Sequence, residues 1–195
     1  MRQSGKLKLE DLMEMSGAQL HRVMEEGTSP DEKLLEGQLF LGVDLSLPPL
    51  ANRILWKTFA KTFWRDPESP ELRGWNIRVE QRGVGGEMVP LVGGDGHPRT
   101  FGHYRLRSAR GMRFPRGWRG AACLDYGAGG NRWWDLARFG LTPIVAVNRG
   151  ESDLLLGWEV LRVAGGLVAL PDYWALCRVG PVKETVSPPM AVGPG

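Results

Sequence analysis

The chain has few of the residues from which metal centres and disulfide frameworks are built. Its 195 residues include two cysteines and three histidines, and these do not follow the spacing of a four-ligand metal site. Cys123 and Cys177 both lie in apolar runs, where a free thiol behaves as a small buried hydrophobic group. Spacing alone does not show whether the two pair. We therefore expect neither a metal nor another cofactor.

Long hydrophobic runs are also missing. No stretch of about 18 apolar residues occurs, and the first residues lack the continuous apolar segment of a secretory signal. These absences predict a cytoplasmic protein without a transmembrane segment.

Common nucleotide-binding and hydrolase motifs do not occur either. There is no G-x-S-x-G sequence, and glycine clusters such as residues 127–130 lack the strand-to-helix context of a phosphate-binding loop. The chain therefore argues against serine hydrolases, zinc hydrolases and dinucleotide-dependent oxidoreductases.

What the chain does contain is a succession of short alternating apolar and polar runs between Arg73 and Arg178, separated by glycine- and proline-rich turns. This pattern predicts a mostly β protein whose antiparallel sheet curls into a barrel or sandwich. Gly165-Gly166 predicts a tight turn between the last two strands, and Pro171 predicts an edge or a bulge. The expected strands cover residues 37–45, 74–81, 88–92, 100–107, 121–126, 144–147, 154–163 and 167–178.

Two helices are expected as well. Residues 8–26 place most of their apolar side chains on one face, which predicts an amphipathic N-terminal helix. Apolar residues from Leu50 to Trp64 also recur at helical spacing, with Lys61 among the cations off that face, and predict a helix packed across the barrel. A membrane-surface helix would show the same pattern. We expect three regions: the N-terminal helix at 1–27, the β-barrel domain at 28–182 and a flexible tail at 183–195.

Tryptophan is abundant, with eight residues in the chain. A buried indole supplies a large rigid surface and one N–H group that needs a partner. Tryptophans therefore line protein cores and ligand cavities alike, and the core role is the commoner one. Trp75 and Trp158 are the candidates to line a cavity.

The net charge is only +3, but the charge is unevenly distributed. Seven arginines and no acidic residue lie between Arg99 and Arg119. Guanidinium groups bind carboxylates and phosphates through paired hydrogen bonds, so this block either meets an acidic group of a ligand, with Arg105 as the candidate, or is a solvated strand and loop. The small total charge argues against nucleic acid as a partner.

Three residues are candidates for proton transfer. His103 lies on an expected strand, on the same face as Phe101, and serves either as an acid or base or as a structural residue. Asp125 and Tyr126 end an apolar strand beside a glycine-rich loop, where Asp125 either moves a proton or caps the turn. Glu159 interrupts an apolar strand, so it either faces solvent or has a partner. His103 and Tyr126 are also candidates for ligand contacts.

Four segments resemble the small uncharacterised bacterial proteins with a calycin-like barrel that are named for a G-x-W-x-G motif: residues 37–42, 124–127, 154–157 and 173–176. The resemblance spans residues 35–179, with Phe40 in place of the motif's tryptophan and one extra residue. It implies a calycin- or lipocalin-like barrel that holds a hydrophobic ligand, and it brings no catalytic residue with it.

The leading hypothesis is therefore the binding of a small hydrophobic or amphipathic ligand in a barrel cavity. One alternative is a cofactor-free isomerase or cyclase in which His103, Asp125 or Glu159 moves a proton. Another is a structural or interaction module in which residues 8–26 dock on a protein partner or on a second copy of the chain. The sequence does not decide whether the protein is an enzyme.

Overall fold

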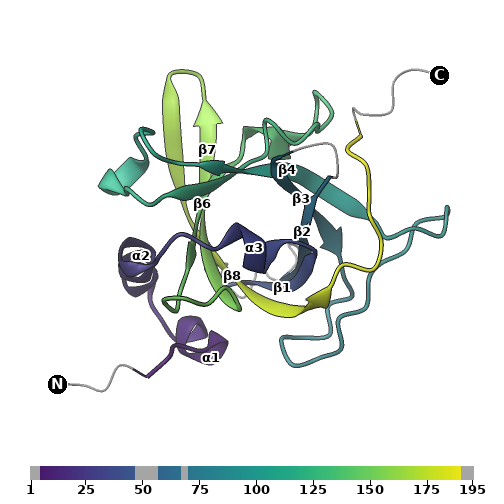
Figure 1. The fold of residues 1–195 in the computed structure, drawn as a ribbon, viewed down its shortest axis with the longest axis horizontal. Coiled ribbons are helices and arrows are strands. Elements are labelled where there is room, and N and C mark those ends of the chain that lie inside the picture. The colour runs from purple at the N-terminus through teal and green to yellow at the C-terminus, as the bar shows by residue number, and fades with distance from the viewer. Residues whose placement is uncertain (1–4, 47–56, 67–69, 190–195) are drawn as a thin grey trace.

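The computed structural model describes residues 5–46, 57–66 and 70–189. Its main element is a closed barrel of antiparallel strands, in which each strand pairs with the next along the chain and the last pairs with the first (Figure 1). The prediction of a mostly β protein with an antiparallel barrel is confirmed. The strands found in the described residues are β1 (Gln38–Asp44), β2 (Thr58–Arg65), β3 (Leu72–Arg78), β4 (Thr100–Ser108), β5 (Ala122–Asp125), β6 (Leu141–Ala146), β7 (Leu154–Val163) and β8 (Gly166–Pro181).

One face of every strand contributes to a single apolar cluster. Because successive residues of a strand point to opposite sides of the sheet, a cluster with members on all strands of a closed barrel fills its interior. Leu35, in the short helix α3 (Glu32–Leu35), joins this cluster and closes the end of the barrel at which β1 begins. The members on strands are Phe40, Phe63, Leu72, Tyr104, Leu106, Ala122, Leu124, Ile144, Ala146, Leu155, Trp174 and Leu176.

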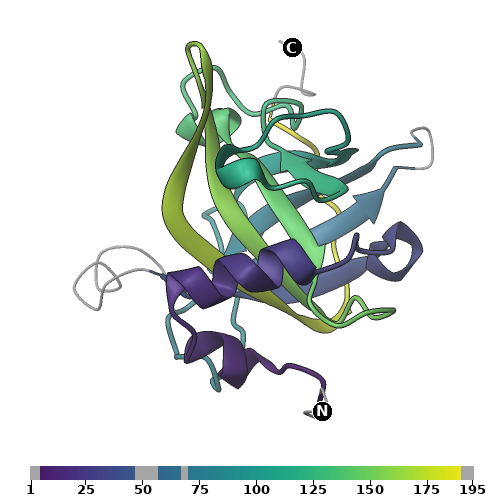
Figure 2. The same ribbon diagram turned by 90° about the vertical axis from the view of Figure 1, so that its left-hand side faces the viewer.

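The expected N-terminal helix forms as two helices, α1 (Leu9–Met13) and α2 (Gly17–Glu26). Ser16 separates them because it caps α2, its Oγ accepting a hydrogen bond from the backbone N–H of Gln19 at 3.4 Å. α2 lies across the outer face of β7 and β8 (Figure 2), and its Leu20 and Met24 are almost fully buried there. The apolar side of α2 is thus covered by the barrel.

The second expected helix is wrong in the part that the structure describes. Residues 47–56 lie outside the described residues, and Thr58–Arg65 forms strand β2. Phe59 and Phe63 are four residues apart, a spacing that puts them on one face of a helix and equally on one face of a strand. A helix and a strand differ in where they place Lys61: a helix would point it away from both rings, whereas a strand places it between them. The spacing of the two phenylalanines alone therefore could not distinguish a helix from a strand.

Three further local predictions have different outcomes. Residues 88–92 form isolated bridges and not a strand, as suits a segment interrupted by Pro90, which has no N–H to donate. The β7–β8 hairpin is confirmed, with Gly165 in its turn at a φ of 94°. The predicted irregularity at Pro171 is also confirmed, because the register between β7 and β8 shifts opposite this residue.

Candidate functional site

The inner surface of the barrel changes from apolar to polar along its axis. The half closed by Leu35 is filled by aliphatic and aromatic side chains. The other half, from which the β1–β2, β3–β4, β5–β6 and β7–β8 connections leave, carries charged and polar groups, and we call it the mouth. A cavity of about 160 Å³ opens there, the mouth cavity, lined by Asp44, Phe59, Lys61, Asn76, Phe101, Tyr126, Glu159, Asp172 and Trp174.

Lys61 on β2 is the most deeply buried charged residue of the mouth cavity, with 1% of its surface exposed. Its Nζ donates hydrogen bonds to Asn76 Oδ1 at 2.6 Å and to Tyr126 Oη at 2.8 Å. Aromatic rings surround the amine: Nζ lies 4.6 Å from the ring centroid of Tyr104, 4.9 Å from Trp174, 5.3 Å from Tyr126 and 5.6 Å from Phe59. The side chain is therefore held by two polar partners inside an aromatic box.

This environment changes the acidity of the amine. Burial lowers the pKa of Lys61 from 10.5 to about 7, because the ammonium ion loses its water, and the nearby charge of Glu159 offsets part of that effect. Aromatic faces attract an ammonium ion but replace only part of its hydration. Near neutral pH the amine thus exists in both protonation states.

Glu159 on β7 points into the same cavity. Thr142 donates from Oγ1 to Glu159 Oε2 at 3.4 Å, and the side chain of Trp174 also hydrogen-bonds to this carboxyl group. Burial raises the pKa of Glu159, and the positive charge of Lys61 opposes the rise. Of the two alternatives for this residue, the structure shows the partnered one.

Asp172 on β8 and Asp44 on β1 form a pair of hydrogen-bonded carboxyl groups. Burial is the main cause that raises the pKa of Asp172 to about 7, and the charge of Asp44 adds to it. Two neighbouring carboxyl groups share a proton readily, because both cannot ionise without repulsion. The mouth therefore holds one carboxyl group, Asp172, and one amine, Lys61, that both have a pKa of about 7.

The structure brings together two of the site residues predicted from the sequence, Tyr126 and Glu159, in the mouth cavity. It does not bring His103 there. Gly102 has a φ of 52° and lies where the β3–β4 register shifts, so Phe101 lies opposite Asn76 on the inner face while His103 turns outward. The predicted shared face of Phe101 and His103 is therefore wrong, because a bulge exchanges the faces.

His103 is buried outside the barrel interior and lines a second, larger hollow described below. It is 2% exposed and stacks on Trp75 with ring centroids 6.4 Å apart. Burial, followed by the charge of Arg73, lowers the pKa of His103 to about 4, so the imidazole is neutral at physiological pH. Trp75 belongs to an apolar cluster on the outside of the barrel, against which Val186 packs.

Asp125 lies on the outer face of β5. Its Oδ1 accepts a hydrogen bond from the backbone N–H of Gly127 at 3.0 Å, which is the turn-capping role. Its carboxylate oxygens also lie 3.6 Å from Arg162 and 3.7 Å from Arg107. The group is thus satisfied outside the barrel.

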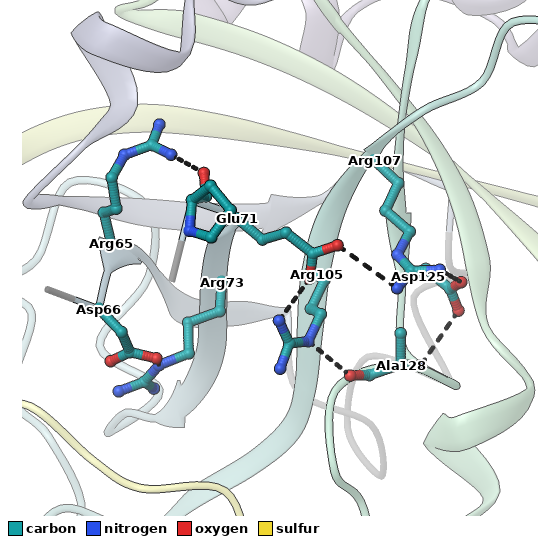
Figure 3. Close-up of polar contacts among 9 residues, drawn as sticks. Arg65, Asp66, Glu71, Arg73, Arg105, Arg107, Asp125 and Ala128 are labelled. Carbon is teal, nitrogen blue, oxygen red and sulfur yellow. Dashed lines mark hydrogen bonds and ion pairs between the residues drawn. The ribbon is translucent and has the colours of Figure 1, made fainter. Parts of the chain in front are cut away.

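Arg105 belongs to the same outer strip of polar contacts (Figure 3). It forms an ion pair with Glu71 and donates from Nε to the carbonyl oxygen of Ala128 at 3.0 Å. Glu71 also lies 3.6 Å from Arg107. These arginines of the basic block therefore have acidic partners within the chain, on the side of the wall opposite the mouth cavity.

Trp158 is fully buried on the outer face of β7, beneath α2. It stacks on Tyr173 with centroids 6.2 Å apart, and its Nε1 donates to the carbonyl oxygen of Leu170 at 2.9 Å. The tryptophan that lines the mouth cavity is Trp174 on β8, whose ring lies over Gly157 in a position that a Cβ atom there would occupy. Which of the two tryptophans lines the cavity depends on which face of its strand points inward, and the sequence leaves this open.

Seven residues that line the mouth cavity were not among the predicted site residues: Asp44, Phe59, Lys61, Asn76, Phe101, Asp172 and Trp174. Asp172 and Trp174 alternate with Tyr173 along the last strand, so an inner face could have been considered there. Lys61 had no such signal once its segment was assigned to a helix.

A larger hollow of about 620 Å³, the side cavity, adjoins the mouth across β4. Phe101 lines both the side cavity and the mouth cavity, and the next residue, Gly102, lines the side cavity. On its other side stand Trp134 and Leu136 of the β5–β6 connection, with 58% and 78% of their surfaces exposed. The side cavity therefore offers apolar surface next to the mouth, together with the charged side chains of Arg78, Arg132 and Asp135.

Within residues 5–46, 57–66 and 70–189, no group of three or more histidine, cysteine, aspartate or glutamate side chains is placed to hold a metal ion. The thiols of Cys123 and Cys177 are both free. None of the helices in this part of the chain has the length and apolar character needed to cross a membrane. Comparisons with protein-family models, curated proteins and solved structures find no match to the chain.

Proposed function

We propose that the protein binds a small amphipathic molecule at the mouth of its barrel. The observation that carries this proposal is the buried amine of Lys61, which lines an open cavity with polar partners and aromatic walls. Buried polar groups oppose folding unless they are fully satisfied, and the closed half of the same barrel is filled with apolar side chains. A convergent polar set in an open hollow is typical of a ligand site.

The lining indicates the kind of ligand. Lys61, Asn76 and Glu159 offer donors and acceptors to a polar group, such as a carbonyl, a hydroxyl or a carboxyl group. Phe59 and Trp174 offer aromatic surface to the carbon skeleton beside it. A purely hydrophobic ligand would displace water from these polar groups and offer them no further hydrogen bond, so an amphipathic molecule fits the cavity better.

The side cavity extends this site. Phe101 lies between the two hollows, and Trp134 and Leu136 expose apolar surface beyond it. The mouth cavity suits the polar end of the ligand, and the side cavity suits a longer remainder with both apolar and polar groups, because Arg132 and Asp135 also line it. This arrangement also gives the exposed side chains of the β5–β6 connection a role.

Two buried tryptophans provide a matched test. Trp174 lines the mouth cavity, whereas Trp158 is buried on the outer wall. Binding of the amphipathic dye anilinonaphthalene sulfonate is measured by fluorescence titration, and native mass spectrometry of the purified protein records any small molecule that leaves on denaturation. We expect Trp174→Ala to weaken dye binding at least about tenfold, roughly the loss of one well-placed aromatic contact, and Trp158→Ala to leave it unchanged where the variant is folded.

Equal dye affinities in both variants and the unmodified protein would contradict binding at the mouth. Circular dichroism at the temperature of the titration separates this outcome from unfolding. Displacement of the dye by a molecule recovered from the native protein would identify the physiological ligand class.

A second candidate function is a cofactor-free proton-transfer enzyme, an isomerase or cyclase. It is favoured by one observation: Lys61 and Asp172, both with a pKa of about 7, line the same cavity as Glu159. Deuterium exchange at the α-carbon of 2-butanone, followed by proton NMR, tests it. Exchange above the buffer rate that Glu159→Gln abolishes would support the enzyme, and exchange at the buffer rate in the unmodified protein would exclude this reaction.

A further inference from the structure

The hydrogen bonds of Lys61 account for the hydrogens of a neutral amine. A neutral amine has two hydrogens and one lone pair, whereas an ammonium ion has three hydrogens. Nζ donates to Asn76 Oδ1 and to Tyr126 Oη. With both hydrogens of the neutral amine used, the lone pair is left for a third direction.

The surroundings of the amine supply further requirements of a nucleophile. Lys61 lines the mouth cavity, so a molecule in that cavity lies next to its side chain. The rings of Tyr104, Trp174 and Phe59 enclose Nζ at 4.6 to 5.6 Å and limit the water around it. A poorly solvated, partly neutral amine is the form of lysine that attacks carbonyl groups.

We propose that Lys61 forms a Schiff base with an aldehyde or ketone bound in the mouth cavity. This inference rests on the proposed function, because the carbonyl compound is a specific class of the small amphipathic ligand. It adds a covalent bond and a named nucleophile to that function.

The reaction is balanced by groups within the cavity. The lone pair of Nζ attacks the carbonyl carbon, the C–N bond forms as the C=O π bond breaks, and the oxygen takes a proton to give a carbinolamine. The nitrogen then loses one proton, and the hydroxyl group leaves as water after protonation by a carboxyl group, while the lone pair of the nitrogen forms the C=N bond of a protonated imine. Loss of the remaining proton from nitrogen to the carboxylate gives the imine, so that amine and carbonyl yield imine and water. Glu159 and Asp172 line the cavity as the acids for these proton transfers.

The imine also connects the site to isomerisation. A protonated imine withdraws electrons from the neighbouring carbon, which makes a proton on that carbon easier to remove. A carboxylate in the cavity would accept it. Lys61 would thus support proton transfer in a carbonyl substrate without a cofactor.

Reductive trapping tests the proposal on the whole protein. Benzaldehyde and sodium cyanoborohydride at pH 7 convert an imine to a stable benzyl amine, and peptide mapping by mass spectrometry locates it. We expect Lys61 to be labelled at least roughly ten times faster than each of the other five lysines of the chain. Lys61→Arg should lose this label, and Lys183→Arg, at an exposed position, should keep it.

The pH profile of trapping gives an independent readout on the unmodified protein. The titratable groups around the amine are Glu159 on β7, Asp172 on β8, Asp44 on β1, Tyr104 on β4 and Tyr126 after β5. Because burial lowers the pKa of Lys61 to about 7, labelling should rise through pH 7 and then level off. A rate that still rises towards pH 10 would overturn the proposal.

Benzyl alcohol, which has the shape of the probe without its carbonyl group, separates the two proposals. Displacement of the dye by benzyl alcohol without labelling of Lys61 by benzaldehyde would overturn the Schiff base and leave ligand binding standing. Labelling spread evenly over the lysines would also overturn the Schiff base. Absence of both displacement and labelling would overturn both proposals.

Discussion

Replacing Lys61 with methionine should change how the stability of the barrel depends on pH. In the unfolded chain this amine keeps its proton up to its ordinary pKa of 10.5, whereas in the barrel it does so only up to a pKa of about 7. Between these values unfolding takes up a proton, so the folded state gains stability as the pH rises. Below pH 7 both states are protonated and the full penalty of the buried charge is present.

The size of the effect follows from the depression of the pKa. A depression of about three and a half units is worth about 5 kcal/mol, at roughly 1.4 kcal/mol per unit, in a side chain that is 1% exposed. The free energy of unfolding of the unmodified protein, measured against that of Lys61→Met, should therefore rise by several kcal/mol from pH 7 to 10.5. The comparison cancels the titration of the tyrosines and thiols, which both proteins share.

Urea unfolding followed by circular dichroism at intervals between pH 7 and 10.5 measures this difference. Lys183→Met, which removes an exposed lysine, should show no such trend against the unmodified protein. A difference between Lys61→Met and the unmodified protein that stays flat over this range would refute the reasoning. It would mean that water reaches the amine and keeps it charged in the folded barrel.

Three other substitutions test other parts of the structure. Trp158→Ala should lower the free energy of unfolding by about 3–5 kcal/mol, because a fully buried ring that stacks on Tyr173 is removed. Urea unfolding measures this change. A change below roughly 1 kcal/mol, the scale of a surface substitution, would contradict the prediction. Gly157→Ala places a methyl group against the ring of Trp174, so it should both destabilise the barrel by about 1–3 kcal/mol and weaken dye binding; Gly166→Ala, whose added Cβ meets no atom within 4 Å, is its control. Burial raises the pKa of Asp172 from 3.8 to about 7. Between these pH values the folded state holds this proton more tightly than the unfolded chain, so the free energy of unfolding falls as the pH rises. Asp172→Asn should reduce this fall, and an unchanged dependence of the free energy of unfolding on pH would contradict the raised pKa.

Local sequence patterns were sufficient for most of the barrel. Alternation of apolar and polar residues, with glycines between the runs, predicted most of its strands and the antiparallel class, and β7 and the hairpin that follows it are the clearest case. Turn residues act over a few positions, so their effect is readable without the rest of the chain. Pro171 marked a local irregularity for the same reason.

The identity of the mouth cavity depended on long-range packing. In a regular strand Phe101 and His103 would share a face. Gly102 introduces a bulge, so Phe101 faces the interior and His103 faces outward. In the sequence, Glu159 was visible as a polar residue that interrupts an apolar run, and Tyr126 as a polar residue at the end of one. Their common position in one cavity was not, because they belong to different strands that meet only when the barrel closes.

Lys61 shows the limit of the sequence most clearly. Two phenylalanines four residues apart fit a helix and a strand equally well, and a lysine between them is ordinarily read as a solvated charge. The pairing of β2 with β1 and β3 places this segment in the wall of the barrel and turns the amine inward. The closed sheet, whose neighbours lie far away in the chain, therefore decided both the burial of the lysine and the chemistry available to it.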